Sequence, residues 1–291
     1  MLTPHFAAGA SQPHIAFPTA ARDRICVASY PFREYIVGRD AKPGNAPIGL
    51  KDFAAHIKEK FKVNKIEPWT GHFPSTDAKY LAEFRAALDK CQCQVANMAV
   101  DGEDSPYSPD PAERARAVAF SKRWIDAAVV LGAPGIRTNI PAARDAKPDL
   151  GRTADSLRQV VEYAASRNVV ISLENDNPIS EDPFFISQVI EKINSPWLHA
   201  LPDFGNTLAH HDPDYAYRAI DAMFAHAYNI CHVKETELTE AGTPVHVDLA
   251  RTFGYLKQHA YKGYCSMEWD SPGDPYVGTA GLIAKTVHYL G

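Results

Sequence analysis

The chain has 291 residues, of which 45% are hydrophobic and 22% are charged, and its formal net charge is −5. This composition is ordinary for a globular protein and excludes a disordered chain, a collagen-like repeat and a small disulfide scaffold. No run of Lys and Arg stands out, which argues against a surface for nucleic acid or for an anionic membrane.

The first residues, MLTPHFAAGASQPHIAFPTAAR, are rich in Pro and Ala and contain no continuous apolar segment of the kind found in signal peptides. We interpret residues 1–23 as an N-terminal arm, either disordered or the remnant of a leader. Five scattered cysteines without a CxxC motif predict reduced thiols and a cytoplasmic location, with an exported, processed form left open. No run approaches 18 consecutive apolar residues, so we expect no transmembrane helix.

From residue 24 onward, short apolar or β-branched runs alternate with longer segments of helical period. We expect strands at 24–32, 65–70, 94–101, 135–140, 169–176, 198–206, 228–237 and 263–270. We expect helices at 50–61, 76–91, 111–132, 153–168, 182–195, 212–227, 247–261 and 279–290. Thr153 and Asp248 are the expected N-caps of two of these helices.

Strands that alternate with helices favour a parallel sheet built from right-handed βαβ units. An open, doubly wound sheet is the alternative, but the chain has no GxGxxG motif after its first strand and no phosphate-loop motif. Eight strand–helix pairs instead match the (β/α)8 barrel. We therefore predict an α/β fold, a single-domain (β/α)8 TIM barrel that spans residues 24–291.

Four potential metal ligands lie at the ends of four consecutive expected strands. Glu174 ends VVISLE and Asp203 ends LHALPD, while His232 and Glu268 lie late in YNICH and GYCSME. In such barrels the carboxyl ends of the strands meet at one face, where function is located. The mixed oxygen and nitrogen donor set suits Mn²⁺, Mg²⁺, Co²⁺, Fe²⁺ or Zn²⁺, and three carboxylates packed together would repel one another without a cation. The sequence thus predicts one divalent metal ion.

Other polar or aromatic residues near the strand ends are candidates for substrate binding. Trp69 would either form an apolar wall for a sugar ring or pack the rim of the barrel, and Glu67 would either contact the substrate or form a salt bridge inside the barrel. Lys234 would either neutralise an enediolate or contact a phosphate, or it would instead pair with Glu235 or with residues near Glu174. Arg137 is a weaker candidate. The full set of substrate-binding candidates is Glu67, Trp69, His72, Asn206, Lys234 and His246.

The segments LEND, LPDFGN, CHVKE and SMEWD resemble the four metal-binding strand ends of the xylose isomerase-like TIM-barrel superfamily. That superfamily includes sugar-phosphate isomerases and epimerases, ketose 3-epimerases, inosose dehydratases and apurinic endonucleases. The resemblance covers about residues 24–290 and is strongest in 169–270. It implies that Glu174, Asp203, His232 and Glu268 bind the metal, and that Glu174 and Glu268 are also the two proton-transfer carboxylates, as in the epimerase branch.

The sequence departs from two branches of this superfamily. The ketose 3-epimerases have a His three residues after the Asp ligand, whereas this chain has Asn206, which weakens the case for the same hydroxyl contacts at C3. The apurinic endonucleases need many more His and Asp ligands. His72 resembles one of them, but the expected strand QVANMAVD offers no His, so we do not expect a DNA-repair enzyme.

We therefore expect an isomerase or epimerase of a small sugar or cyclitol that moves a proton through a metal-stabilised enediolate. A lyase or dehydratase that acts on a keto-sugar or inosose at the same site is the second hypothesis. A sugar-binding barrel without catalysis is the third. No cluster of Gly and Lys indicates a phosphate site, and the sequence leaves a homo-oligomer open.

Overall fold

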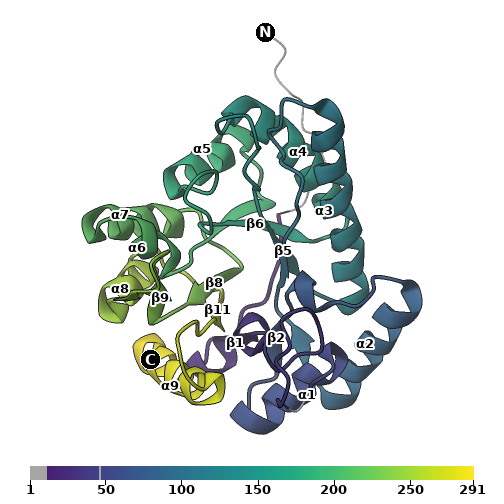
Figure 1. Cartoon of the computed structure of the whole chain (residues 1–291), viewed down its shortest axis with the longest axis vertical. Helices are drawn as coiled ribbons and strands as arrows, with labels where there is room; N and C mark the ends of the chain where they lie inside the picture. Colours follow the sequence, from purple (N-terminus) through teal and green to yellow (C-terminus); the bar gives the residue numbers. More distant parts are fainter. Residues whose placement is uncertain (1–11, 46) are drawn as a thin grey trace.

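The computed structural model describes residues 12–45 and 47–291, which form a ring of parallel strands surrounded by helices (Figure 1). The strands are β1 Ile25–Ala28, β2 Lys65–Glu67, β3 Gln94–Val95, β4 Met98–Val100, β5 Gly135–Thr138, β6 Val170–Glu174, β7 Leu198–Leu201, β8 Ile230–Val233, β9 Thr236–Leu238, β10 Pro244–His246 and β11 Tyr264–Met267. The α-helices are α1 Leu50–Phe61, α2 Ala78–Cys91, α3 Pro111–Leu131, α4 Leu150–Ser166, α5 Pro183–Ile193, α6 Asn206–His210, α7 Pro213–Phe224, α8 Leu249–Gln258 and α9 Pro275–Leu290. Short 3-10 helices span Ala21–Arg24, Tyr30–Phe32 and Thr70–His72.

The ring consists of two parallel sheets joined at two seams. One sheet has the strand order β3-β2-β1-β11-β8, and the other has the order β4-β5-β6-β7. At the first seam, an isolated bridge pairs Trp69 with Ala99. At the second seam, isolated bridges pair Ala200 with Ala227 and Asp203 with His232. Since β3 and β4 together occupy one position, the ring has eight strand positions, and the predicted (β/α)8 barrel is confirmed.

The helices begin where the sequence provides caps. Four of them, α3, α5, α7 and α9, start with an Asp N-cap followed by Pro, a residue that fits the first turn because its missing N–H needs no partner there. Asp274 therefore starts α9 four residues before the expected start. The expected Thr153 cap is wrong, because Asp149 caps α4 by accepting a hydrogen bond from the Arg152 backbone N–H at 2.8 Å. The Asp248 cap of α8 is confirmed.

All eight expected strands are shorter in the structure than the sequence pattern predicts, and three of them end or divide at an identifiable feature. The first strand ends at Ala28 and continues into a 3-10 turn. The strand expected at 94–101 divides into β3 and β4 at Asn97, whose buried side chain donates a hydrogen bond to Glu67 at 2.7 Å. The strand expected at 228–237 ends at Val233, after which β9 pairs antiparallel with β10. This hairpin lies outside the ring, beside the carboxyl ends of the strands (Figure 1).

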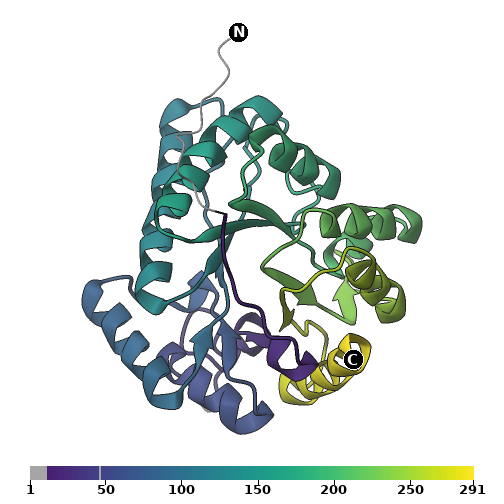
Figure 2. The same cartoon turned by 180° about the vertical axis from the view of Figure 1, so that it is seen from behind.

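The described part of the expected N-terminal arm crosses the amino-terminal end of the barrel (Figure 2). Phe17 lies edge-on to Tyr228 and Tyr264, with ring centroids 5.4 and 5.5 Å away. The Tyr228 hydroxyl donates a hydrogen bond to the Pro13 carbonyl at 3.0 Å. This segment therefore covers the end of the barrel opposite the strand carboxyl ends. Residues 1–11 lie outside the described residues, and the domain boundary between 23 and 24 stays a proposal.

Two further sequence predictions concern the chain as a whole. Within residues 12–45 and 47–291, none of the helices combines the length and the apolar character that crossing a lipid bilayer requires. All five cysteines are free thiols, as expected from their spacing, and four of them are buried.

Candidate metal centre and active site

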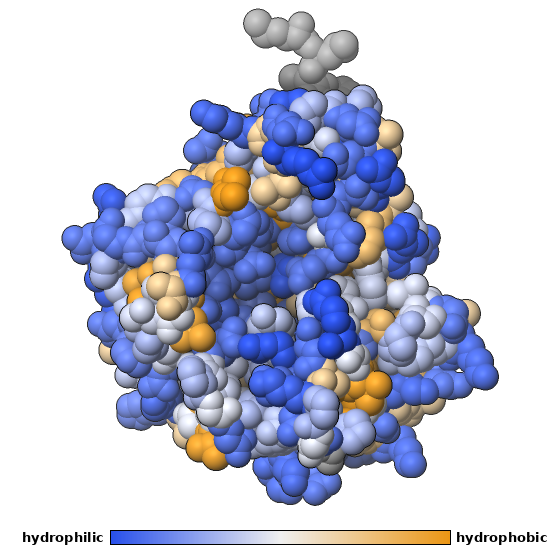
Figure 3. Space-filling view, viewed as in Figure 1, coloured by the Kyte–Doolittle hydropathy of each residue, from blue (hydrophilic) through white to orange (hydrophobic). Residues whose placement is uncertain are grey.

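A cavity of about 640 Å³ opens at the carboxyl ends of the strands. Figure 3 shows it as a hollow near the centre of this face, surrounded mainly by hydrophilic residues. Its walls come from residues that follow strands on both sheets and from the β9–β10 hairpin. The strands thus place polar side chains around one concave space, at the end of the barrel where such folds bind their ligands.

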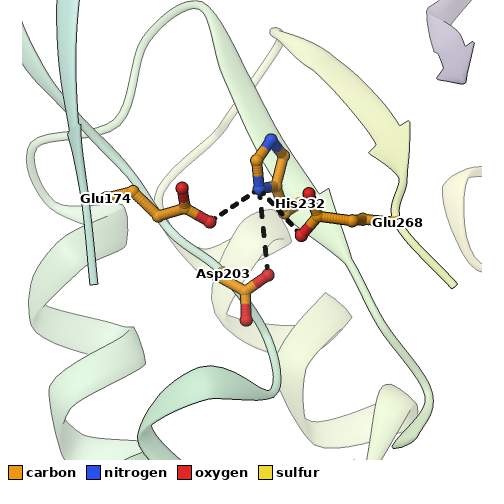
Figure 4. A group of neighbouring side chains, drawn as sticks. All are labelled: Glu174, Asp203, His232 and Glu268. Carbon is orange, nitrogen blue, oxygen red and sulfur yellow. Dashed lines mark hydrogen bonds and ion pairs between the residues drawn. The ribbon is translucent and has the colours of Figure 1, made fainter. Parts of the chain in front are cut away.

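The four predicted ligands meet at the bottom of this cavity, where Glu174 and Glu268 line it and Asp203 and His232 lie buried directly behind them. One donor atom from each of Glu174, Asp203, His232 and Glu268 lies within 4.8 Å of all the others, and all four residues are buried. In Figure 4 the three carboxylates converge on Nδ1 of His232. The distances from this atom are 2.7 Å to Glu174 Oε1, 3.2 Å to Glu268 Oε2 and 3.9 Å to Asp203 Oδ2.

The Asp203 carboxylate provides a direct test of whether these residues fit a divalent ion. Its Oδ1 accepts hydrogen bonds from the backbone N–H groups of Gly205 at 2.8 Å and Asn206 at 2.7 Å. Its Oδ2 is buried and accepts no hydrogen bond from the described residues. Its nearest cationic neighbour is Lys234 Nζ at 3.6 Å, and a buried carboxylate oxygen without a hydrogen bond is costly, so a bound cation would satisfy it. The three carboxylates and one imidazole therefore fit a divalent metal ion.

Glu67 orients the His232 imidazole. Glu67 Oε2 lies 2.9 Å from His232 Nε2, and its Oε1 accepts a hydrogen bond from Asn97 at 2.7 Å. Glu67 is only 1% exposed, so of the two alternatives for this residue, the interaction inside the barrel is the one observed. With Nε2–H donated to Glu67, Nδ1 faces the other carboxylates, and its lone pair would bind a metal ion once the ring has lost the Nδ1 proton. Metal-binding histidines commonly have a carboxylate partner of this kind.

Lys234 lies beside the cluster with its ammonium group enclosed. Its Nζ donates hydrogen bonds to Asn206 and Glu237, both at 2.7 Å, and lies 3.3 Å from Glu268 Oε2. Burial disfavours the charged form, but the carboxylates of Asp203, Glu268 and Glu237 outweigh it and raise the pKa of Lys234 well above its usual value. Lys234 is thus a fixed positive charge on the cavity wall, and both alternatives expected for it remain compatible with its position.

The remaining sequence candidates differ in their access to the cavity. Trp69 and Asn206 line it. His72 lies behind the wall, where it is buried, bonds to Ser29 Oγ at 2.9 Å and packs against the Trp69 ring. Burial lowers the pKa of His72 to about 4, so its ring is neutral. His246 is exposed on β10 and does not line the cavity. The structure therefore does not bring these two histidines to the site.

Several cavity residues escaped the sequence analysis. Asp176 and Asp270 line the cavity and each follows a ligand glutamate by two residues, so the two-residue repeat of an extended chain could have pointed to them. Arg137, a weak candidate from sequence, is buried with its Nε 2.8 Å from Glu174 Oε2. The Nη1 atom of the same guanidinium group pairs with Asp101. No sequence signal indicates these last contacts, because they join residues from different strands.

Without an ion, the cluster holds protons that a metal must displace. Burial and the charges of Glu174 and Glu268 raise the pKa of Asp203 to about 8, although Lys234 opposes this rise. Burial lowers the pKa of His232, but the charges of the surrounding glutamates outweigh it and raise the pKa well above its usual value. At pH 6 the free site therefore carries more protons than a metal-bound site would.

We predict that Mn²⁺ binding strengthens as pH rises from 6 to 9, by about tenfold per pH unit for each proton displaced. Calorimetric titration in two buffers of different ionisation enthalpy measures both the affinity and the number of protons released. An affinity that is constant across this range, with no proton release, would contradict the prediction.

The fold and the cluster define a (β/α)8 barrel whose cavity ends on a group of metal-ligand-type side chains, two from each sheet. The chain belongs to the xylose isomerase-like TIM barrel family, whose sequence model matches residues 52–287. No curated protein matches the sequence. Similar solved structures share less than 20% identity with the chain, so they support the fold rather than an activity.

Three of these structures illustrate the likeness. A D-allulose 3-epimerase from Methylomonas sp. has a TM-score of 0.72 and 15% identity, covering 94% of this chain and 100% of its own. A xylose isomerase-like TIM barrel protein from Mycobacterium smegmatis, solved in complex with magnesium, has a TM-score of 0.69 and 16% identity, covering 93% and 98%. A 3-keto-D-glucoside 4-epimerase from E. coli has a TM-score of 0.64 and 18% identity, covering 90% and 98%.

Proposed function

We propose that this protein is a divalent-metal-dependent isomerase or epimerase that acts on a small sugar or cyclitol. The observation that carries the proposal is the cluster of Glu174, Asp203, His232 and Glu268 at the floor of a polar cavity. Support also comes from the similar structures, two of which are sugar epimerases and one of which contains magnesium. Mn²⁺, Mg²⁺, Co²⁺, Fe²⁺ and Zn²⁺ all remain candidates for the ion.

The chemistry needs a proton acceptor on each face of the substrate and compensation for negative charge on its oxygens. When bound, the ion would supply Lewis-acid stabilisation of that charge. Glu174 and Glu268 enter the cavity from opposite sheets, so we propose that one removes the proton beside the carbonyl while the other, in its protonated form, delivers a proton to the opposite face, and that both re-equilibrate with solvent.

The surroundings of these two glutamates support this assignment. Glu268 forms no hydrogen bond that would block its second oxygen, because its contacts with His232 and Lys234 both use Oε2. Arg137 Nε lies 2.8 Å from Glu174 Oε2 and fixes the direction of that carboxylate. Lys234 Nζ adds a positive charge within 3.3 Å of Glu268. Trp69, on the cavity wall, would pack against a sugar ring.

A lyase or dehydratase on a keto-sugar or inosose is the alternative, because the same proton removal followed by loss of a β-substituent needs the same residues. A sugar-binding barrel without catalysis is the third candidate. Product mass separates the first two, since isomerisation leaves the mass unchanged and elimination lowers it. Binding without solvent-hydrogen exchange would favour the third.

The decisive experiment combines metal analysis of the purified protein with a panel of ketoses, keto-glycosides and inososes in deuterated water. We expect deuterium at one substrate carbon, dependent on an added divalent ion and abolished by a chelator. Exchange at one carbon identifies the reacting position even where little product accumulates. Exchange that is undiminished after complete metal removal would exclude the proposed chemistry.

A further inference from the structure

The cavity has a strong imbalance of charge. Nine of its lining residues carry carboxyl groups, whereas four are Arg or Lys. A divalent ion on the floor would offset only part of this excess. The interior would still repel an anionic substrate, because charges in an enclosed space of low polarity are poorly screened.

The four cations of the cavity wall are already neutralised by the protein. Each forms an ion pair with a carboxylate that lines the same cavity. The pairs are Arg33–Asp270 at 2.9 Å, Arg39–Asp40 at 3.4 Å, Arg137–Glu174 at 2.8 Å and Lys234–Glu237 at 2.7 Å. The Arg39 pair is the most exposed and therefore the weakest. A phosphate or carboxylate on a substrate would have to displace one of these carboxylates before it gained a cationic partner.

The position where barrels of this type often hold phosphate is acidic here. That position is formed by the loops after the seventh and eighth strands of the ring, which are β8 and β11 in this chain. The segment after β8 places Glu237, on β9, in the cavity, and the loop after β11 places Asp270 there. The cation in the first loop, Lys234, is 5% exposed and held by Asn206 and Glu237.

We infer that the cavity selects an uncharged polyhydroxylated substrate and excludes sugar phosphates and sugar acids. This inference rests on the proposed function for the reaction itself and narrows the class of substrate. The ion pairs that reject an anion suit a neutral sugar, since each offers N–H donors and carboxylate acceptors side by side to neighbouring hydroxyl groups. Asp270 is the main determinant, because it neutralises the half-buried Arg33 guanidinium, which also stacks 4.3 Å from the Tyr30 ring centre.

The first test is calorimetric titration of the Mg²⁺-loaded protein with inorganic phosphate. The wild type should show no saturable binding. Asp270→Asn frees Arg33 and should bind phosphate at least about tenfold more tightly than the wild type, because it removes a like charge from the site. Asp155→Asn is the matched control, since it frees Arg158, paired with it at 3.2 Å on the outer helix α4, and should behave as the wild type. Saturable binding by the wild type, or no gain in Asp270→Asn, would overturn the inference.

The second test compares neutral ketoses with their phosphate esters in deuterated water, using D-allulose, D-fructose and their 6-phosphates. Exchange with a neutral ketose and not with its ester supports the inference. Faster exchange with an ester overturns it and leaves the proposed function intact. Absence of exchange with every compound here and in the broader panel counts against the proposed function, while the phosphate titration still decides the charge preference of the cavity.

Discussion

Replacing Glu268 with glutamine should slow solvent-hydrogen exchange at the substrate carbon by about 10²- to 10⁴-fold, the usual contribution of a general base. Glutamine keeps the size of the side chain, but its amide cannot accept a proton at neutral pH. Glu174→Gln should have an effect of the same order if the two carboxylates serve opposite faces of the substrate. Both variants should fold, because each substitution conserves volume on the cavity floor.

A variant that no longer binds the metal would also show slow solvent-hydrogen exchange, so the measurement must distinguish loss of the metal from loss of the proton acceptor. Exchange is therefore followed by NMR at increasing Mn²⁺ concentration, and bound metal is measured in the same samples. Glu191→Gln, on the exposed outer surface of α5, is the matched control and should retain wild-type exchange. If Glu174→Gln retained full exchange and full metal content, the two-carboxylate mechanism would be wrong.

Glu67→Gln should weaken Mn²⁺ binding by about 10- to 100-fold, the usual cost of removing the carboxylate partner of a metal-binding histidine. Glu67 fixes the direction of the His232 ring through Nε2, and a neutral amide would hold the same ring less firmly. The affinity is measured by titration of the metal-free protein. The ¹⁵N chemical shifts of the imidazole report its tautomer, which a purely structural role of Glu67 would not change.

A suitable control for this experiment lies in the same cavity. Glu237 lines the cavity but contacts Lys234 rather than the imidazole, so Glu237→Gln should change Mn²⁺ affinity much less. If Glu67→Gln bound metal normally but bound the sugar more weakly, Glu67 would be the substrate contact that the sequence also allowed. The two outcomes assign Glu67 either to the metal or to the sugar.

The four-residue cluster could be predicted from sequence because its geometry follows from the fold. Each of Glu174, Asp203, His232 and Glu268 ends or follows an apolar run, and parallel strands of a barrel bring such positions to one face. Eight of the nine α-helices in the described residues lie within four residues of their expected bounds because apolar repeats are local signals, whereas the short α6 was not expected. The helix positions depend on residues that are near one another in the chain, and the position of the cluster depends on the regular arrangement of strand ends in a barrel.

The rest depended on contacts that no local pattern records. Glu67 and His232 are 165 positions apart, and an acidic residue at the end of a strand appears the same whether it faces a sugar or an imidazole. The β9–β10 hairpin continues the apolar and polar alternation of β8, so the point where the chain leaves the ring cannot be recognised from the pattern alone. Neither His72 nor His246 lines the cavity, because His72 is buried behind its wall and His246 is exposed on the β9–β10 hairpin.

The second seam of the ring gives the proposed ion a mechanical role. Glu174 and Asp203 belong to the four-stranded half of the barrel, and His232 and Glu268 belong to the five-stranded half. Between β7 and β8 the backbone contributes isolated bridges instead of a continuous ladder, and one of these joins Asp203 to His232. A bound ion would therefore connect the two halves at this edge, where only isolated bridges join their backbones. Loss of the ion would then remove a contact between the two halves at the place of the proposed chemistry, while the backbone hydrogen bonds from His232 to Pro202 and from Phe204 to His232 would remain.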